Sequence, residues 1–149
     1  MFTLAGAVVT WRSCKQTILT WSTMEAELVA LDMATVEAEW LREILMDLPL
    51  VEKLVLAILM YCDNQTVLIK VMSTKDNLKS SRCVKRRLRS VGKLKNSRVI
   101  AVNYIRSEKN LADPFTKGLA RTTISVANMD MGLSVTPRVL ALHNLTCIA

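Results

Sequence analysis

An uninterrupted apolar run from Leu54 to Cys62 constrains the fold of this chain more than any other feature. The run is far shorter than the roughly 20 apolar residues that a membrane-spanning helix needs, so it predicts no span. Continuous apolar runs of this length are typical of strands buried on both faces, as in parallel sheets covered by helices. The run therefore predicts an α/β domain whose core strand ends near Cys62.

A long helical pattern precedes this strand. From Met24 to Leu48 apolar residues recur at about 100° per residue and form one face, which predicts the longest helix of the chain. Ser22 or Thr23 is a suitable N-cap, and Pro49 ends the pattern. A second apolar stripe predicts that the helix is covered on two sides; its members are Met33, Val36, Trp40 and Ile44.

The remaining patterns complete the order ββ-α-β-α-α-β-α, which predicts one α/β domain with a mixed sheet flanked by helices. This domain covers residues 1–121, and residues 122–149 form a weakly patterned tail for which we expect little regular structure. The other expected elements are two strands joined at Gly6 within Phe2–Trp11, helices at Thr66–Met72 and Leu78–Ser97, a strand at Val99–Ile105 and a helical turn within Leu111–Leu119.

Cysteine usage and the N-terminal composition bear on the compartment. The four cysteines lie far apart with no CxxC pair, and His143 is the single histidine, which argues against a zinc site. No basic region followed by an apolar one begins the chain, so we expect no signal peptide. These features predict an intracellular chain, cytoplasmic or nuclear and not secreted, with reduced thiols and no membrane contact.

The net charge of +7 comes from one segment. Ten basic residues and no acid lie between Asp76 and Glu108, whereas the rest of the chain holds ten basic residues against thirteen acids. Such a helix is either a solvated surface or a surface that binds polyanions, because clustered cations neutralise phosphates and release counterions. The candidate nucleic-acid-binding residues are Arg82, Lys85, Arg86, Arg87, Arg89 and Lys93.

Three carboxylates stand out by position. Glu27 lies on the apolar face of the long helical pattern, where a charge needs a cationic partner. Asp63 directly follows the core strand, at the edge where α/β sheets hold their sites, and Asp113 opens a short helix. Each residue alone is explained by capping or by an ion pair. Together they could ligate Mg²⁺, which prefers oxygen ligands.

Four sequence blocks resemble the ribonuclease H domain at the end of copia-type retrotransposon polyproteins. They occur in the order and at the spacing of that family and cover about residues 2–121. In the family this domain follows a reverse transcriptase in the same polyprotein. The blocks are Trp11–Gln16, Ser22–Leu31, Tyr61–Gln65 and Asn110–Leu119.

The resemblance implies a ribonuclease H-like fold and a specific chemistry. In the family, four acids hold two divalent ions, Mg²⁺ or Mn²⁺, that cut the RNA strand of an RNA–DNA hybrid. The match carries three catalytic and metal-binding acids onto Glu27, Asp63 and Asp113, which we expect to converge. The fourth acid normally lies on a first strand upstream of Phe2 and has no counterpart here, so we expect poor metal binding and impaired cleavage.

That first strand is the central one of five in ribonuclease H-like folds. We therefore expect the hairpin within Phe2–Trp11 and the strand within Leu54–Cys62 to have unpaired edges, which favour aggregation. Cys83 also stands where the family usually has His, and the tail after about Pro137 matches no part of the family. These departures indicate a truncated retrotransposon remnant whose partner is an RNA–DNA hybrid or another nucleic acid.

Two alternatives remain open. A non-catalytic module that binds nucleic acid through the basic helix at residues 79–98 predicts strongly salt-dependent binding without cleavage. A fragment without function predicts low solubility and no cooperative unfolding.

Overall fold

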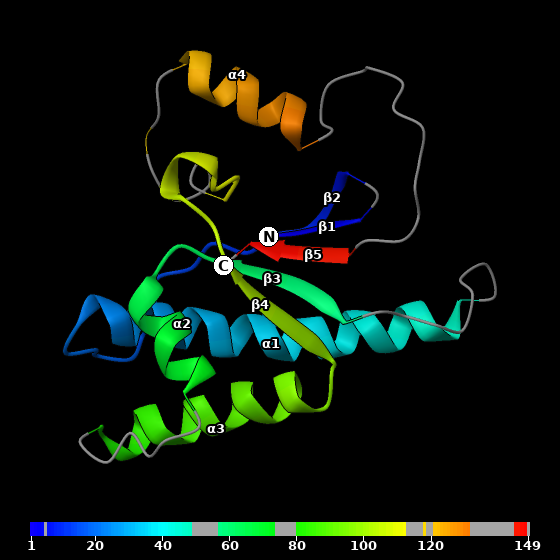
Figure 1. The fold of residues 1–149 in the computed structure, drawn as a ribbon. Coiled ribbons are helices and arrows are strands. Elements are labelled where there is room, and N and C mark those ends of the chain that lie inside the picture. Colours follow the sequence, from blue (N-terminus) through cyan, green and yellow to red (C-terminus); the bar gives the residue numbers. More distant parts are fainter. Residues whose placement is uncertain are drawn as a thin grey trace.

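The computed structural model describes residues 1–4, 6–48, 57–73, 80–112, 118, 121–131 and 145–148. These residues form a mixed α/β fold around one five-stranded sheet in the order β2-β1-β5-β3-β4 (Figure 1). The α/β class expected from the sequence is thus confirmed. The strands are β1 (Phe2–Leu4), β2 (Ala7–Thr10), β3 (Ile58–Cys62), β4 (Ile100–Tyr104) and β5 (Leu145–Ile148). The helices are α1 (Thr23–Asp47), α2 (Gln65–Met72), α3 (Arg82–Asn96) and α4 (Arg121–Asp130), with a short 3-10 turn η1 (Ser107–Lys109).

The core lies between the parallel strands and helices α1, α2 and α3. Strand β3 pairs in parallel with both β4 and β5, as its apolar sequence predicts. Ile58, Met60 and Cys62 are buried together with Leu28 and Leu31 of α1. The alternate residues of β3 are only half-buried, so this strand is covered fully on one face and partly on the other. Full burial on both faces, as the apolar run predicts, is therefore not found.

Helix α1 is the longest helix of the described residues, and its bounds agree with the expected 23–48 span. Its N-terminus is set locally, because the Ser22 side chain accepts a hydrogen bond from the Glu25 amide at 3.2 Å. The predicted apolar face is confirmed, since Leu28, Leu31 and Ala38 are fully buried. Burying large aliphatic side chains stabilises the fold by roughly 1.5–3 kcal/mol each.

The second apolar stripe of α1 is not covered. Met33, Val36, Trp40 and Ile44 are between 38% and 63% exposed, so the prediction of a helix buried on two sides is wrong. The polar side of α1 contacts α3, because Asp32 forms an ion pair with Arg87 of that helix. The helix thus contacts α3 through a charge pair while its second stripe faces solvent.

The central position of the sheet is occupied by β5, from the segment for which little structure was expected. Strand β5 runs antiparallel to β1, with Thr3 opposite Thr146, and parallel to β3, with Met60 opposite Cys147. The expected unpaired edges on the hairpin and on β3 are therefore absent, and this prediction is wrong. Unpaired strand edges need backbone partners, and the last residues of the chain supply them here.

The hairpin, α2, α3 and β4 follow the expected order. Gly6 turns the hairpin with φ +80°, a conformation that glycine adopts without steric cost. Helix α4, which the sequence pattern did not indicate, meets the hairpin through a hydrogen bond from the Val8 amide to the Met131 carbonyl at 3.2 Å. Of the helical turn expected within Leu111–Leu119, residues 113–117 and 119 lie outside the described residues. Among the described helices, none has the length and apolar character needed to cross a bilayer.

Candidate carboxylate edge and nucleic-acid interface

The carboxyl end of β3 brings the chain into a turn that leads directly to α2. Asp63 follows the last residue of the strand, and the Asn64 side chain caps α2 by accepting hydrogen bonds from the Thr66 and Val67 amides at 3.0 and 3.2 Å. Asn64 therefore accounts for the cap, and Asp63 is left half-buried beside it. The explanation of Asp63 as a helix cap does not hold.

Asp63 has a partner that the sequence did not indicate. The Ser107 hydroxyl donates a hydrogen bond to Oδ2 of Asp63 at 3.4 Å. Ser107 lies in η1, just after β4, and comes close because Cys62 and Tyr104 end the two parallel strands side by side. Only the pairing of these strands indicates this contact, since the two residues are far apart in the chain.

Glu27 and Asp63 share the surroundings of one thiol. Burial raises the pKa of Cys62, a hydrogen bond with the Asn64 backbone opposes this rise, and the negative charges of Glu27 and Asp63 add to it. Both carboxylates therefore lie close enough to the Cys62 thiol to influence its charge. Glu27 is half-buried in the first turns of α1, as its place on the apolar face predicts. Two of the three predicted acids thus lie in the surroundings of Cys62.

The third predicted acid, Asp113, lies outside the described residues. Before it, Asn110 is buried, and its side-chain oxygen accepts a hydrogen bond from the Ala112 amide at 2.9 Å. This Asx turn orders the backbone at the start of the fourth motif block. The predicted convergence of all three acids stays a prediction.

The described residues do not by themselves provide a metal site. No group of three or more His, Cys, Asp or Glu side chains that could hold a metal occurs within the described part of the chain. The central strand β5 has the sequence Leu-Thr-Cys-Ile and contributes no carboxylate to this edge. Two carboxylates near a buried thiol make a poor site for Mg²⁺, which binds oxygen ligands in octahedral geometry.

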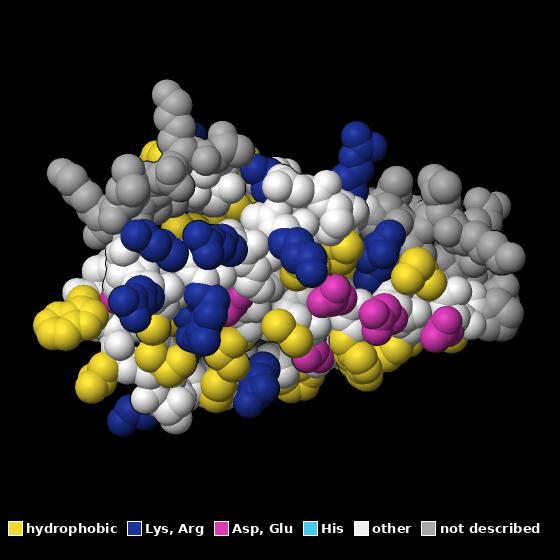
Figure 2. Space-filling view, turned by 90° about the horizontal axis from the view of Figure 1, so that it is seen from below, with side chains coloured by type: hydrophobic (Ala, Val, Ile, Leu, Met, Phe, Trp, Pro, Cys, Tyr) yellow, Lys and Arg dark blue, Asp and Glu magenta, His cyan; other side chains and the backbone are white. Residues whose placement is uncertain are grey.

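Helix α3 separates its apolar and basic residues into two faces. Val84, Val91 and Leu94 are buried in the core, and Ser81 caps the helix by accepting a hydrogen bond from the Val84 amide at 3.3 Å. We use the term α3 basic face for four exposed residues that recur at helical spacing on the opposite side of the helix: Arg82, Arg86, Arg89 and Lys93. Figure 2, viewed from the side of α3, shows Lys and Arg side chains gathered on this surface and acids grouped elsewhere.

Two of the six predicted nucleic-acid-binding residues are in other surroundings. Arg87 donates to Asp32 of α1 at 2.6 Å, and the two side chains are only 13% and 18% exposed. This pair holds α3 against α1, so Arg87 is a packing contact rather than part of the exposed surface. Lys85 is half-buried. The candidate interface therefore consists of the α3 basic face alone.

No protein-family model, curated protein or solved structure matches this chain significantly. The resemblance of the four motif blocks to the copia-type ribonuclease H domain therefore stays a prediction.

Proposed function

We propose that this chain is a ribonuclease H-related domain that binds nucleic acid through the α3 basic face and has lost most or all of its cleavage activity. The observation that carries the binding proposal is the set of four exposed cations on one face of α3. Clustered cations of this kind bind phosphates and release condensed counterions. The RNA–DNA hybrid enters the proposal through the resemblance of the motif blocks.

The arrangement of the sheet supports the proposed ancestry. The hairpin of β1 and β2 lies on one side of the central strand β5. Strands β3 and β4 lie on the other side and run parallel to β5. The family implied by the resemblance has the same layout with its first strand at the centre, whereas β5 takes that position here. Of the two matched acids that are described, Asp63 directly follows β3, and the charges of both Glu27 and Asp63 act on the Cys62 thiol.

The proposed loss of cleavage rests on the central strand. In the family this strand supplies an acid, whereas β5 has none. Two divalent ions about 3.5–4 Å apart need several carboxylates to bind them. When bound, such ions activate water and stabilise the leaving oxygen. This chain's own contribution is then limited to holding Glu27 and Asp63 near Cys62 and positioning Asp63 through Ser107.

A non-catalytic nucleic-acid-binding module is the second candidate. It is favoured by the same α3 basic face together with the lack of a three-residue metal cluster in the described residues. The two candidates differ in whether any residual cleavage depends on Glu27.

The binding proposal is tested with a labelled RNA–DNA hybrid and the Arg89→Glu variant. Arg89→Glu should weaken binding about tenfold and reduce the slope of log K against log salt concentration by roughly 1, because one phosphate contact is lost. The matched control is Arg121→Glu, which reverses an exposed charge on α4 and should leave the affinity unchanged. Equal affinities of both variants would contradict the proposal.

Cleavage is followed on the same hybrid in Mg²⁺ and in Mn²⁺. We expect little or no product from the native chain, and any residual product should disappear in Glu27→Gln. Product that persists in Glu27→Gln comes from a contaminating nuclease. Efficient cleavage that depends on Glu27 would contradict the proposed impairment, and no cleavage at any metal concentration favours the non-catalytic module.

A further inference from the structure

The segment between β2 and α1 exposes apolar side chains that the proposed function does not yet use. Trp21 and Leu19 are each 96% exposed, and Trp11 is 58% exposed. Arg12 and Lys15 lie in the same segment and are also exposed. Exposed apolar side chains that gather together mark interaction sites, and Trp11, Leu19 and Trp21 lie in one segment.

Trp21 is held in place by the start of α1. Its backbone amide donates to Oε2 of Glu25 at 2.9 Å, while the Glu25 amide donates to the Ser22 hydroxyl at 3.2 Å. These two hydrogen bonds form a variant of the capping box. An apolar residue just before an N-cap commonly packs on the first turns of its helix, but the Trp21 ring does not. The backbone is therefore ordered while the indole ring remains available to a ligand.

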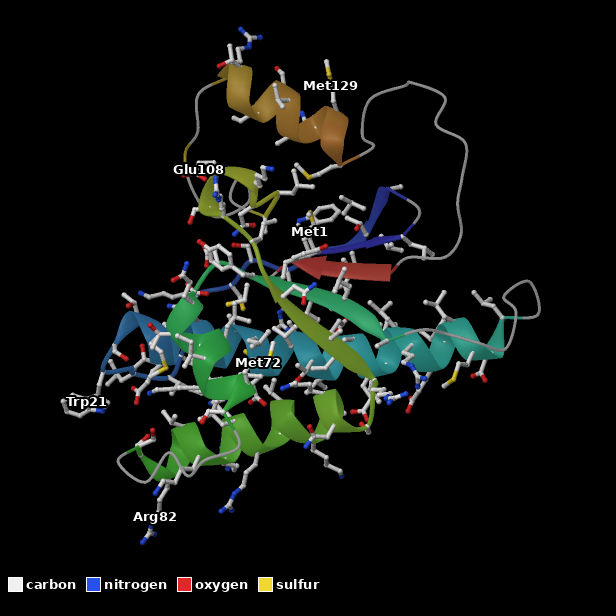
Figure 3. All side chains as sticks on the ribbon, viewed as in Figure 1. Met1, Trp21, Met72, Arg82, Glu108 and Met129 are labelled. Carbon is white, nitrogen blue, oxygen red and sulfur yellow. The ribbon has the colours of Figure 1, made fainter. Side chains whose placement is uncertain are left out.

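The ring lies at the end of the molecule where the α3 basic face begins. Helices α1 and α3 run side by side in the same direction, and the Asp32–Arg87 pair fixes their alignment (Figure 1). Measured from this pair, the start of α1 at Thr23 lies about 14 Å and Arg82 about 8 Å towards the N-terminal end of the helices, at about 1.5 Å per residue, and Trp21 precedes Thr23 by two residues. Figure 3 shows the Trp21 and Arg82 side chains projecting from this same end.

An aromatic ring at the same end of the molecule as a row of cations suits a ligand that has both planar faces and phosphates. Stacking of an unpaired base on an aromatic side chain is a general means of binding single-stranded nucleic acid. A membrane surface would require apolar residues along α3 as well. No large apolar side chain of α3 is exposed, because Val84, Val91 and Leu94 are buried. A nucleic-acid strand therefore fits this surface better than a lipid bilayer.

We infer that the Trp21 indole stacks on an unpaired base of a nucleic-acid strand whose phosphates contact the α3 basic face. This inference rests on the proposed nucleic-acid binding and adds a specificity for single strands or for a single-stranded end beside a duplex. The ring acts by contact with the base, and the cations act on the phosphates. The two contributions are therefore separable by their dependence on salt.

The test compares Trp21→Ala, Trp21→Phe and Trp40→Ala in binding a labelled oligothymidylate and a blunt DNA duplex of equal length. Stacking contributes about 1–3 kcal/mol per base, so Trp21→Ala should weaken oligothymidylate binding roughly 5- to 150-fold and leave duplex binding unchanged. The salt slope should stay the same, because no phosphate contact is lost. Trp21→Phe should restore most of the affinity. Trp40, which is 54% exposed in the middle of α1, provides the matched control and should have no effect.

The outcomes separate this inference from the proposed function. If Arg89→Glu weakens oligothymidylate binding and Trp21→Ala does not, stacking by Trp21 is overturned and nucleic-acid binding stands. If neither variant changes binding, both are overturned. The last experiment uses vesicles of phosphatidylserine and phosphatidylcholine. If these vesicles shift the tryptophan emission to the blue, Trp21→Ala removes the shift and oligothymidylate has no effect on the emission, the Trp21 ring binds a lipid surface instead.

Discussion

At the scale of single residues, the surroundings of Cys62 change the acidity of its thiol. Its side chain is 1% exposed, and burial together with the charges of Glu27 and Asp63 raises the pKa of its thiol. Cys14 and Cys83, in contrast, are free and exposed. The expected burial of Cys62 is thus confirmed. The thiolate is the reactive form of cysteine, so these three residues should differ in reactivity.

Alkylation at pH 8 should therefore modify Cys14 and Cys83 and spare Cys62 until the protein unfolds, as peptide mapping by mass spectrometry will show. The raised pKa also means that the unfolded chain loses the Cys62 proton first as pH rises. The Cys62 contribution should thus lower the free energy of unfolding above the ordinary thiol range, and Cys62→Ser should reduce that pH dependence. Rapid labelling of Cys62 in the folded protein would show that β3 does not end in the core.

At the scale of elements, α3 ends in a conformation that its sequence does not favour. The Val99 amide donates to the Leu94 carbonyl at 3.0 Å and the Arg98 amide to the Lys95 carbonyl at 3.1 Å, which together form a Schellman motif. Arg98 has φ 57°, the left-handed conformation in which most helices carry glycine. A side chain in this conformation costs roughly 1–2 kcal/mol.

Replacing Arg98 by Gly should raise the free energy of unfolding by about 1 kcal/mol relative to Arg98→Ala, measured by urea denaturation. Alanine is the matched control, because it removes the same charge but keeps the Cβ atom that disfavours a positive φ. Equal stability of the two variants would contradict the Schellman end of α3. Neither variant touches the α3 basic face, so nucleic-acid binding should change little.

At the scale of the whole molecule, β5 joins the two parts of the sheet. It supplies backbone partners to β1 on one side and to β3 on the other, and no other described strand bridges them. Loss of β5 leaves two unpaired edges, which are templates for pairing between chains. The stability of the domain should therefore depend on a short segment at the end of the sequence.

Thr146→Pro should disrupt this strand, because proline lacks the amide hydrogen and Thr146 is paired with both Thr3 and Leu59. We expect a loss of at least about 3 kcal/mol of stability, or aggregation seen by light scattering after size exclusion. Thr146→Val is the matched control, since it keeps a β-branched residue in the strand. Cooperative unfolding of Thr146→Pro at the native midpoint would contradict the central position of β5.

The sequence alone determined the features that depend on neighbouring residues. The extent of helix α1 could be predicted because its period, its Ser22 cap and the proline after it act within a few turns. The hairpin turn at Gly6, the buried strand end at Cys62 and the basic exposed side of α3 followed from equally local patterns. Glu27 was found because a carboxylate on an apolar face contradicts that pattern.

The tertiary structure alone decided the features that depend on contacts between distant segments. No local pattern indicates that residues 145–148 become the central strand, because a four-residue run gains its stability only from the β1 and β3 edges on either side. Ser107 meets Asp63, and Arg87 meets Asp32, for the same reason: parallel strands and packed helices bring them together. The period of the second apolar stripe of α1 predicts burial, but the stripe is exposed. Periodicity indicates which residues share a face of a helix, and only the tertiary structure decides whether another element covers that face.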